Sequence, residues 1–158
     1  MTNTPQIRLA DLSDAERITT LINAAFHIAE SFFIDGNRIT TQEVSELLHV
    51  GHFLMNEDEE SLTGCVYVEL RGDRSYLGLL SVDPKLQRSG LGSKLLAEAE
   101  DYARRAGARL IDIYVVNLRE DLPAYYGKRG YVETGTTPFP EGVKTKLPCF
   151  FINMSKEL

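Results

Sequence analysis

The sequence predicts a single α+β domain built on a mixed sheet, and three observations carry this prediction. The chain has 158 residues, enough for one hydrophobic core and short for two domains. Apolar residues recur at helical spacing in some segments and at strand spacing in others. A long helical pattern is followed by a continuous apolar strand, as in a crossover that returns the chain to a parallel neighbour.

A short strand and a helix are expected first. Residues 7–9 are extended in pattern, and Asp11 or Ser13 offers a helix cap; Ser13 and Glu16 have the spacing of a capping box. One face of the helix that follows is apolar, so we expect it in the core. Its apolar positions are Leu12, Ala15, Ile18, Leu21, Ile22, Ala25 and Phe26.

An antiparallel meander is expected next. Residues 30–38 have the composition of a loop or of an interrupted second helix. Thr40 and Glu43 repeat the capping-box spacing before a short helix that closes near Gly51. Strands separated by an acidic turn at 57–61 and an Arg-Gly-Asp-Arg turn are then expected at 52–56, 62–70 and 75–82.

The C-terminal half changes from helix to strand. After Pro84 a helical pattern runs to Gly107, which stops it. Residues 109–116 are nearly continuous in apolar and β-branched residues, which is typical of a central strand buried on both faces. The remaining elements expected are a short helix over about 122–129, ended by Gly130, and strands over 131–137 and 148–154.

Composition argues against several function classes. The formal net charge is -6, whereas nucleic-acid binding usually needs a clustered basic face; cationic substrates remain compatible. No apolar run is long enough to cross a bilayer, so no membrane partner is expected. Cys65 and Cys149 suit buried thiols in a reducing compartment, which predicts a soluble, cytoplasmic protein. Three histidines without carboxylates at zinc-ligand spacing predict no metal site.

The segment 79–96 carries the strongest chemical signal. A buried strand breaks at proline, and a helix then begins at Gly90 and Gly92. The first amides of a helix lack intrahelical acceptors, and glycine has no Cβ to hold a bulky phosphate away. Arg88 and Lys94 can add charge-assisted contacts or be solvated cations. The segment therefore predicts an anion site, with a tight loop that merely enters the helix as the alternative.

Two common phosphate motifs do not fit this segment. The dinucleotide fingerprint needs a third glycine, and no glycine precedes Lys94 at the P-loop spacing. The pattern that remains is Gln87-x-x-Gly90-x-Gly92. It is moderately specific by itself, so the flanking segments decide its interpretation.

Residues 76–132 resemble the GNAT superfamily of N-acetyltransferases. Leu80-Ser81-Val82-Asp83-Pro84 is similar to the family's fourth strand and its exit, and Gln87 to Gly92 to its pyrophosphate loop. Val116-Asn117 resembles the end of its fifth strand, and residues 122–131 its short helix. The resemblance implies one acyl-CoA N-acyltransferase domain over residues 1–158, with a mostly antiparallel central sheet and helices on both faces.

The same resemblance implies how acetyl-CoA, the acyl donor, would bind. The strand at 80–82 would run beside the pantetheine arm and supply an oxyanion donor. Amides of residues 88–92, with Ser93 behind them, would hold the pyrophosphate, and Asn117 would contact the arm or position the thioester. The cofactor-binding residues implied are Leu80, Ser81, Val82, Gln87, Arg88, Ser89, Gly90, Leu91, Gly92, Ser93, Asn117 and Tyr126.

The chemistry implied is attack of a neutral amine on the thioester, with a thiolate as leaving group. Tyr126 stands where the family's proton donor lies, and a phenol suits this role because its ordinary pKa exceeds that of a thiol. Packing on the helix face is the alternative role of Tyr126 and the main role expected of Tyr125.

A general base is harder to find, because the strand at 75–82 contains no carboxylate. Glu69, at the end of the preceding strand, is the candidate catalytic base, acting directly or through water. His27 and Glu30 are alternatives. A water chain without a dedicated base is also compatible, since binding and proximity supply much of the barrier reduction.

The acceptor is an amine of a small molecule or a peptide, and its pocket is expected between residues 27–38 and 137–148. Glu30, Asp35 and Glu141 would suit a cationic amine there, or are solvated surface charges. A homodimer is compatible with the resemblance. Two other functions stay open: a non-catalytic acyl-CoA-binding regulatory module, and a structural domain without a cofactor.

Overall fold

A seven-stranded sheet organises the fold, in the order β1-β2-β3-β4-β5-β7-β6. The computed structural model describes residues 6–58 and 61–158. Neighbouring strands are antiparallel except β4 and β5, which are parallel. The strands are β1 (Gln6–Leu9), β2 (His52–Glu57), β3 (Leu62–Arg71), β4 (Arg74–Val82), β5 (Leu110–Val116), β6 (Val132–Pro138) and β7 (Phe150–Glu157).

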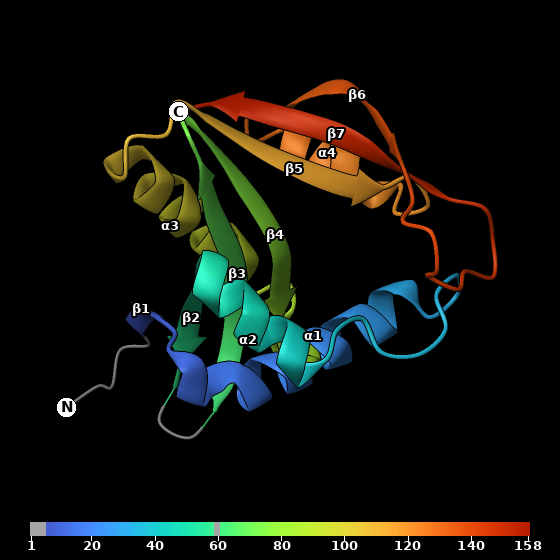
Figure 1. Cartoon of the computed structure of the whole chain (residues 1–158), viewed down its shortest axis with the longest axis horizontal. Coiled ribbons are helices and arrows are strands. Elements are labelled where there is room, and N and C mark those ends of the chain that lie inside the picture. The colour runs from blue at the N-terminus through green and yellow to red at the C-terminus, as the bar shows by residue number, and fades with distance from the viewer. Residues whose placement is uncertain (1–5, 59–60) are drawn as a thin grey trace.

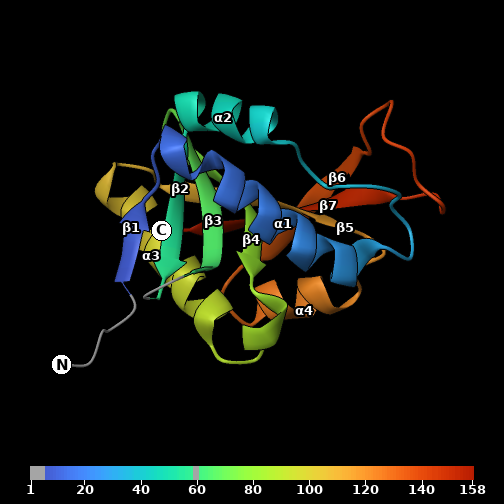
Figure 2. The ribbon, with the colours of Figure 1, turned by 90° about the horizontal axis from the view of Figure 1, so that it is seen from below.

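Helices cover both faces of this sheet, as Figure 2 shows. α1 (Ala15–Glu30) and α2 (Thr41–Val50) lie on one face; α3 (Leu91–Arg105) and α4 (Asp121–Gly127) lie on the other. Single 3-10 turns, η1 (Leu12–Asp14) and η2 (Pro84–Leu86), precede α1 and α3. Each face has its own buried apolar cluster, because each helix turns its apolar stripe toward the strands. The predicted fold class is therefore confirmed.

The local signals at the two N-terminal helices had different outcomes. The Thr40–Glu43 capping box is present at the start of α2. The Ser13–Glu16 box is wrong, because Asp11 caps η1 instead and its amide donates to the Asp14 carboxylate at 2.9 Å. Leu12 therefore lies in η1, outside the apolar stripe, and is 53% exposed.

The stretch after α1, for which a loop and an interrupted second helix were both open, is a loop. Residues 31–40 form turns and loop, with an isolated bridge from Ile34 to Thr145. The acidic turn predicted at 57–61 includes positions 59 and 60, which lie outside the described residues. Within the described part of the chain, none of the helices combines the length and apolar character needed to cross a membrane.

The prediction that β5 is buried on both faces is wrong for one face. Ile111, Ile113 and Val115 are buried, but Tyr114, which points to the other side, is 41% exposed. The reason is that β4 leaves β5 early, so that this part of β5 borders a cavity instead of a packed layer.

The separation of β4 and β5 shapes the molecule. The two strands pair only from Arg74 to Tyr76 of β4 and then diverge, as Figure 1 shows. Beyond that point β4 contains one extra residue relative to β3, because Gly78 pairs with Tyr67 while Ser81 pairs with Cys65. This bulge includes Leu79, whose φ of 56° is in the left-handed region that side chains rarely adopt. The bend leaves the β5-facing edge of β4 without a strand partner.

Candidate functional site

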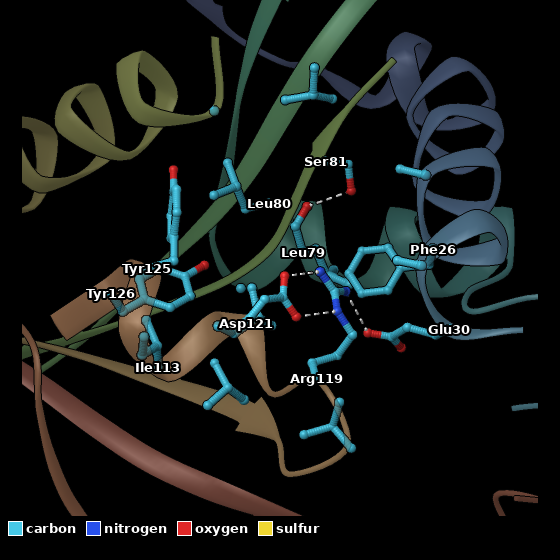
Figure 3. A pocket seen from close by; sticks show the side chains of 18 of the residues that line it. Phe26, Glu30, Leu79, Leu80, Ser81, Ile113, Arg119, Asp121, Tyr125 and Tyr126 are labelled. Carbon is cyan, nitrogen blue, oxygen red and sulfur yellow. Dashed lines mark hydrogen bonds and ion pairs between the residues drawn. The ribbon is translucent and has the colours of Figure 1, made fainter. Parts of the chain in front are cut away.

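A cavity of about 650 Å³ opens where β4 and β5 separate. Its volume is within the usual range for small-molecule and cofactor sites. α1, β4, the loop before α3, β5 and α4 all contribute to its lining, and Figure 3 shows several of these side chains. Among the predicted site residues, the lining includes Leu80, Ser81, Val82, Gln87, Arg88, Gly90, Gly92, Ser93 and Tyr126.

The loop that leads from η2 into α3 is shaped by two left-handed residues, Arg88 with a φ of 68° and Gly90 with a φ of 87°. Gly90 is the N-cap of α3, and no side chain caps this helix end. The amides of the first turn therefore lack an intrahelical acceptor, and no capping side chain accepts from them. They lie at the positive end of the helix dipole. The uncapped helix start borders the cavity through Gly90, Gly92 and Ser93.

Gly92 has a different role from Gly90. Its φ is not in the left-handed region, and a Cβ placed on it would meet the Tyr125 hydroxyl at 3.6 Å and a Val82 methyl at 3.7 Å, which are ordinary contacts. The fold therefore tolerates a side chain at Gly92. The missing side chain leaves space on the cavity side of the helix start.

Ser93, Tyr125 and Arg129 form a network that ties α4 to the first turn of α3. Arg129 donates to the Ser93 hydroxyl at 2.7 Å and to the Tyr125 carbonyl at 2.8 Å. Its guanidinium lies 3.7 Å from the centroid of the Tyr125 ring, whose hydroxyl is 3.2 Å from Ser93 Oγ. Tyr125 thus does more than pack. Arg129 lies within the segment 122–131 that carries the resemblance, but sequence reasoning assigned it no role, because its partner Ser93 is 36 residues away in the chain.

Tyr126 is 7% exposed and lines the cavity. Its ring packs edge to face against Tyr125 and Tyr131, with centroids at 5.2 Å and 5.4 Å. Burial raises the pKa of Tyr126 above the ordinary phenol value, and the neighbouring Tyr125 adds to the effect. The hydroxyl therefore keeps its proton at neutral pH and can serve as a donor.

Four of the predicted residues, Ser89, Leu91, Glu69 and Asn117, are not among the described residues that line the cavity. Glu69 accepts a hydrogen bond from the Tyr67 hydroxyl at 2.8 Å and is ion-paired with Arg71. Although burial raises the pKa of Glu69, the bonds from Arg71 and Tyr67 outweigh it and hold the value below the usual range.

Asn117 connects the end of β5 to β7. Its side-chain oxygen accepts from the Phe150 amide at 2.8 Å, and its own amide donates to the Phe150 carbonyl at 2.9 Å. These two bonds engage the side-chain oxygen and the backbone amide of Asn117. The side chain therefore has a structural partner in the absence of any ligand.

Glu30, one of the alternatives to Glu69, does line the cavity and is 7% exposed. Its carboxylate is 3.3 Å from Arg119, which also contacts Asp121 at 3.3 Å; Figure 3 shows Arg119 between the two acids. Burial raises the pKa of Glu30 despite the opposing effect of Arg119. His27, the other alternative, does not line this cavity.

No cluster of three or more metal-ligating side chains occurs among residues 6–58 and 61–158. The charged groups of the cavity instead come as single side chains and pairs. The arrangement as a whole offers an open helix start, an unpaired strand edge, a protonated phenol and a buried carboxylate in one space.

Comparison with known sequences places this arrangement in a family. Residues 17–131 match the model of the acetyltransferase (GNAT) family. Uncharacterized protein YdhI of Bacillus subtilis (strain 168) is 30% identical over 81 residues, which make up 51% of this chain and 49% of that protein. The chain therefore matches about half the length of this curated relative.

Solved structures share the fold across almost the whole chain. The ribosomal-protein-S18-alanine N-acetyltransferase of Escherichia coli has a TM-score of 0.77 at 16% identity, covering 98% of this chain and 94% of that one. The PaiA N-acetyltransferase of Thermoplasma acidophilum, in complex with coenzyme A, has a TM-score of 0.79 at 15% identity, covering 98% and 99%. A putative acetyltransferase of Salmonella typhimurium, with acetyl-CoA, has a TM-score of 0.76 at 23% identity, covering 98% and 94%. At such identities the likeness establishes the fold.

Proposed function

This chain belongs to the acetyltransferase (GNAT) family, and on that premise we propose that it transfers an acetyl group from acetyl-CoA to a primary amine of a small molecule or peptide. The observation that carries the proposal is the uncapped start of α3, which shares one cavity with Tyr126. The thioester supplies the activated acetyl group, and direct attack by the amine needs only positioning and proton transfers from the protein.

The start of α3 fits a diphosphate. Gly90 and Gly92 leave its first amides uncovered, and Arg88 on the cavity side can add a charge-assisted contact. Gly92 supports this assignment in particular, because the fold has room for a side chain there while glycine is the poorer helix former. Glycine at this position lowers the stability of the helix and is not required by the packing. Its presence is therefore consistent with a ligand that approaches the backbone closely.

The unpaired edge of β4 fits the extended arm that connects the diphosphate to the thioester. Past Tyr76 this edge has no β5 partner, so backbone groups between Leu80 and Val82 are free to bond to an amide-containing chain laid alongside, as an added strand would. An amide on the same edge can stabilise the oxyanion that forms when the thioester carbonyl is attacked.

Tyr126 is assigned as the proton donor to the leaving thiolate. Burial keeps its phenol protonated. A thiolate formed in the same poorly hydrated cavity is destabilised by the same lack of water, so its basicity rises with that of the phenol. Proton transfer between the two therefore remains accessible although the pKa of Tyr126 is raised.

For the base we favour Glu30 over Glu69. Glu30 lines the cavity, and its raised pKa improves a carboxylate as a proton acceptor near neutral pH. Glu69 is held by Tyr67 and Arg71 and has a lowered pKa. A role for Glu69 would require a water relay into the cavity.

The proposal is tested by measuring acetyl-CoA binding and thiol release with a panel of amines. Tyr126→Phe should keep acetyl-CoA affinity and lower turnover by about 10²- to 10⁴-fold, the usual contribution of a general acid. Tyr102→Phe, on α3 outside the cavity lining, is the matched control and should change neither. Full turnover in Tyr126→Phe would contradict the assignment, and tight binding without thiol release for any amine would favour a non-catalytic acyl-CoA-binding module.

A further inference from the structure

A row of aromatic rings forms one wall of the cavity. Tyr76 of β4, Tyr114 of β5 and Phe151 of β7 follow one another across the sheet, with ring centroids 5.6 Å and 6.2 Å apart. Phe139, just after β6, stacks on Phe151 at a centroid distance of 4.8 Å. All four side chains line the cavity. We refer to these four residues as the aromatic row.

The aromatic row lies where a packed layer would normally cover it. Tyr114 is on a strand with neighbours on both sides, yet it is 41% exposed. Phe26 reaches into the same cavity from α1, as Figure 3 shows. Aromatic faces in a concave site have a large area to bury and favour flat partners in offset or edge-to-face contact. The cavity is therefore suited to a ligand with an aromatic ring.

Among the described residues, Arg38 is a cavity cation that has no carboxylate within ion-pair distance and is not assigned to the diphosphate. Arg119 is balanced by Glu30 and Asp121, and Arg88 belongs to the loop proposed for the diphosphate. Arg38 lines the cavity 5.6 Å from the Phe26 ring centroid, and across the described ranges 6–58 and 61–158 it makes no ion pair or hydrogen bond. Arg38 and Glu30 both line this cavity and also line a small adjoining pocket beside Phe26, so the two opposite charges share one end of the cavity.

We propose, resting on the proposed N-acetyltransferase function, that the acceptor is an aromatic amine that also carries a carboxylate, of the class to which aromatic amino acids belong. Glu30 faces the amine, Arg38 the carboxylate, and the aromatic row the ring. In the reaction the amine nitrogen bonds to the acetyl carbon as the carbon–sulfur bond breaks. The amine proton passes to Glu30 and the thiolate takes the proton of Tyr126, so the products are an N-acetyl amino acid and free CoA thiol. Glu30 then loses its proton to water and the Tyr126 phenolate takes one from water, which restores both side chains.

The same arrangement disfavours other amines. A polyamine would bring additional positive charge beside Arg38, where like charges repel. A small aliphatic amine would leave the aromatic row uncovered and gain none of its contact energy. An amine without an anion would make no charge-assisted contact with Arg38. These differences make the proposal selective enough to test with matched compounds.

The first test compares kcat/KM at saturating acetyl-CoA for phenylalanine, tyrosine and tryptophan with that for phenethylamine and alanine. Phenethylamine lacks the carboxylate, and alanine lacks the ring. We expect the best aromatic amino acid to exceed both by about tenfold or more, the discrimination typical of a pocket contact. Equal or better turnover of phenethylamine or of alanine would overturn the proposal, as would equal or better turnover of spermidine, measured in the same assay as a representative polyamine.

Variants connect the selectivity to the named residues. Arg38→Gln should lower kcat/KM for the aromatic amino acid about 10- to 100-fold, as expected for one lost charged hydrogen bond, and leave phenethylamine unchanged. Tyr114→Ala should lower kcat/KM for both the aromatic amino acid and phenethylamine and leave kcat/KM for alanine unchanged. Phe139→Ala, outside the strands, replaces it if the Tyr114 variant does not fold. Arg109→Gln, just before the start of β5 and outside the cavity lining, should leave every ratio unchanged. An Arg38→Gln variant with unchanged selectivity would contradict the assignment.

Acetyl-CoA binding separates this inference from the function on which it rests. A protein that binds acetyl-CoA and acetylates other amines, but no aromatic amino acid, overturns the acceptor class alone. A protein whose melting temperature does not rise with acetyl-CoA, and which acetylates nothing, overturns the proposed function and the acceptor class with it.

Discussion

Replacing Gly92 by alanine separates the needs of the fold from those of a bound diphosphate. A Cβ at Gly92 would make only ordinary contacts, at 3.6 Å and 3.7 Å, so no strain is expected. Alanine exceeds glycine in helix propensity by about 0.8–1 kcal/mol in a helix interior. Gly92→Ala should therefore leave the free energy of unfolding unchanged or raise it by up to about 1 kcal/mol, which corresponds to a melting temperature higher by at most about 2–4 °C.

Binding should change in the opposite direction. The added methyl would stand on the cavity side of the helix start, where the amides of α3 are proposed to meet the diphosphate. Loss of one hydrogen bond to a charged group costs about 1.5–3 kcal/mol, so the Kd for CoA should rise about 10- to 100-fold. Titration calorimetry measures the Kd, and scanning calorimetry of the free protein measures the melting temperature.

Gly90→Ala is the contrasting variant. Its φ of 87° is in the left-handed region, where a Cβ costs roughly 1–2 kcal/mol, so this variant should lose stability as well as affinity. If Gly92→Ala instead melted at a lower temperature and bound CoA as tightly as the parent, Gly92 would serve the fold and the reasoning about the helix start would be refuted.

Three further substitutions test the packing and the charges around the site. Tyr131→Phe removes the 2.8 Å hydrogen bond to buried Glu100 and should lower the free energy of unfolding in urea by about 1–3 kcal/mol; an unchanged urea midpoint would contradict this. Gly51→Ala places a Cβ 2.7 Å from a backbone carbonyl of β3 and should cost about 1–3 kcal/mol by overpacking, visible as a lower melting temperature. Arg74 holds the pKa of Asp112 below its usual range through hydrogen bonds of 2.8 Å and 2.6 Å. This pair stabilises the folded protein at pH values above the ordinary carboxyl pKa, and its contribution is lost as the pH falls through the lowered pKa of Asp112. Arg74→Gln should therefore have a lower melting temperature than the parent protein at pH 7. In acid the two melting temperatures should become equal. A difference in melting temperature between the variant and the parent that stayed constant down to low pH would contradict this linkage.

Elements whose signals lie within a few residues were predictable. The Thr40–Glu43 capping box and the left-handed glycines at 107 and 130 mark element ends in the structure as they do in the sequence, because caps and turns depend on adjacent residues. The Ser13–Glu16 box failed for a similarly local reason. Asp14, three residues after Asp11, completes the capping box with Asp11, and Arg8 of β1 also donates hydrogen bonds to the Asp14 carboxylate.

Two local motifs of the sequence both contribute to the lining of the cavity. Gln87, Arg88, Gly90, Gly92 and Ser93 come from the loop and helix start, and Tyr125 and Tyr126 come from α4. The base was harder, because Glu69 and Glu30 are both carboxylates near expected helix and strand ends. Only the fold shows that Glu69 is held by Tyr67 and Arg71 outside the cavity lining, while Glu30 is buried within it.

By itself the sequence determined the kinds and order of the helices and strands, the glycines at the start of α3, and the phenol on α4, since each depends on residues close together in the chain. Only the tertiary structure decided which distant side chains share the cavity. Pairing of β4 with β5 stops after Tyr76, and the bulge at Leu79 bends β4 away. The cavity that results brings together Glu30, Arg38 and the aromatic row. Strand register and strand bending determine where each of these side chains points, and both depend on the packing of the whole sheet.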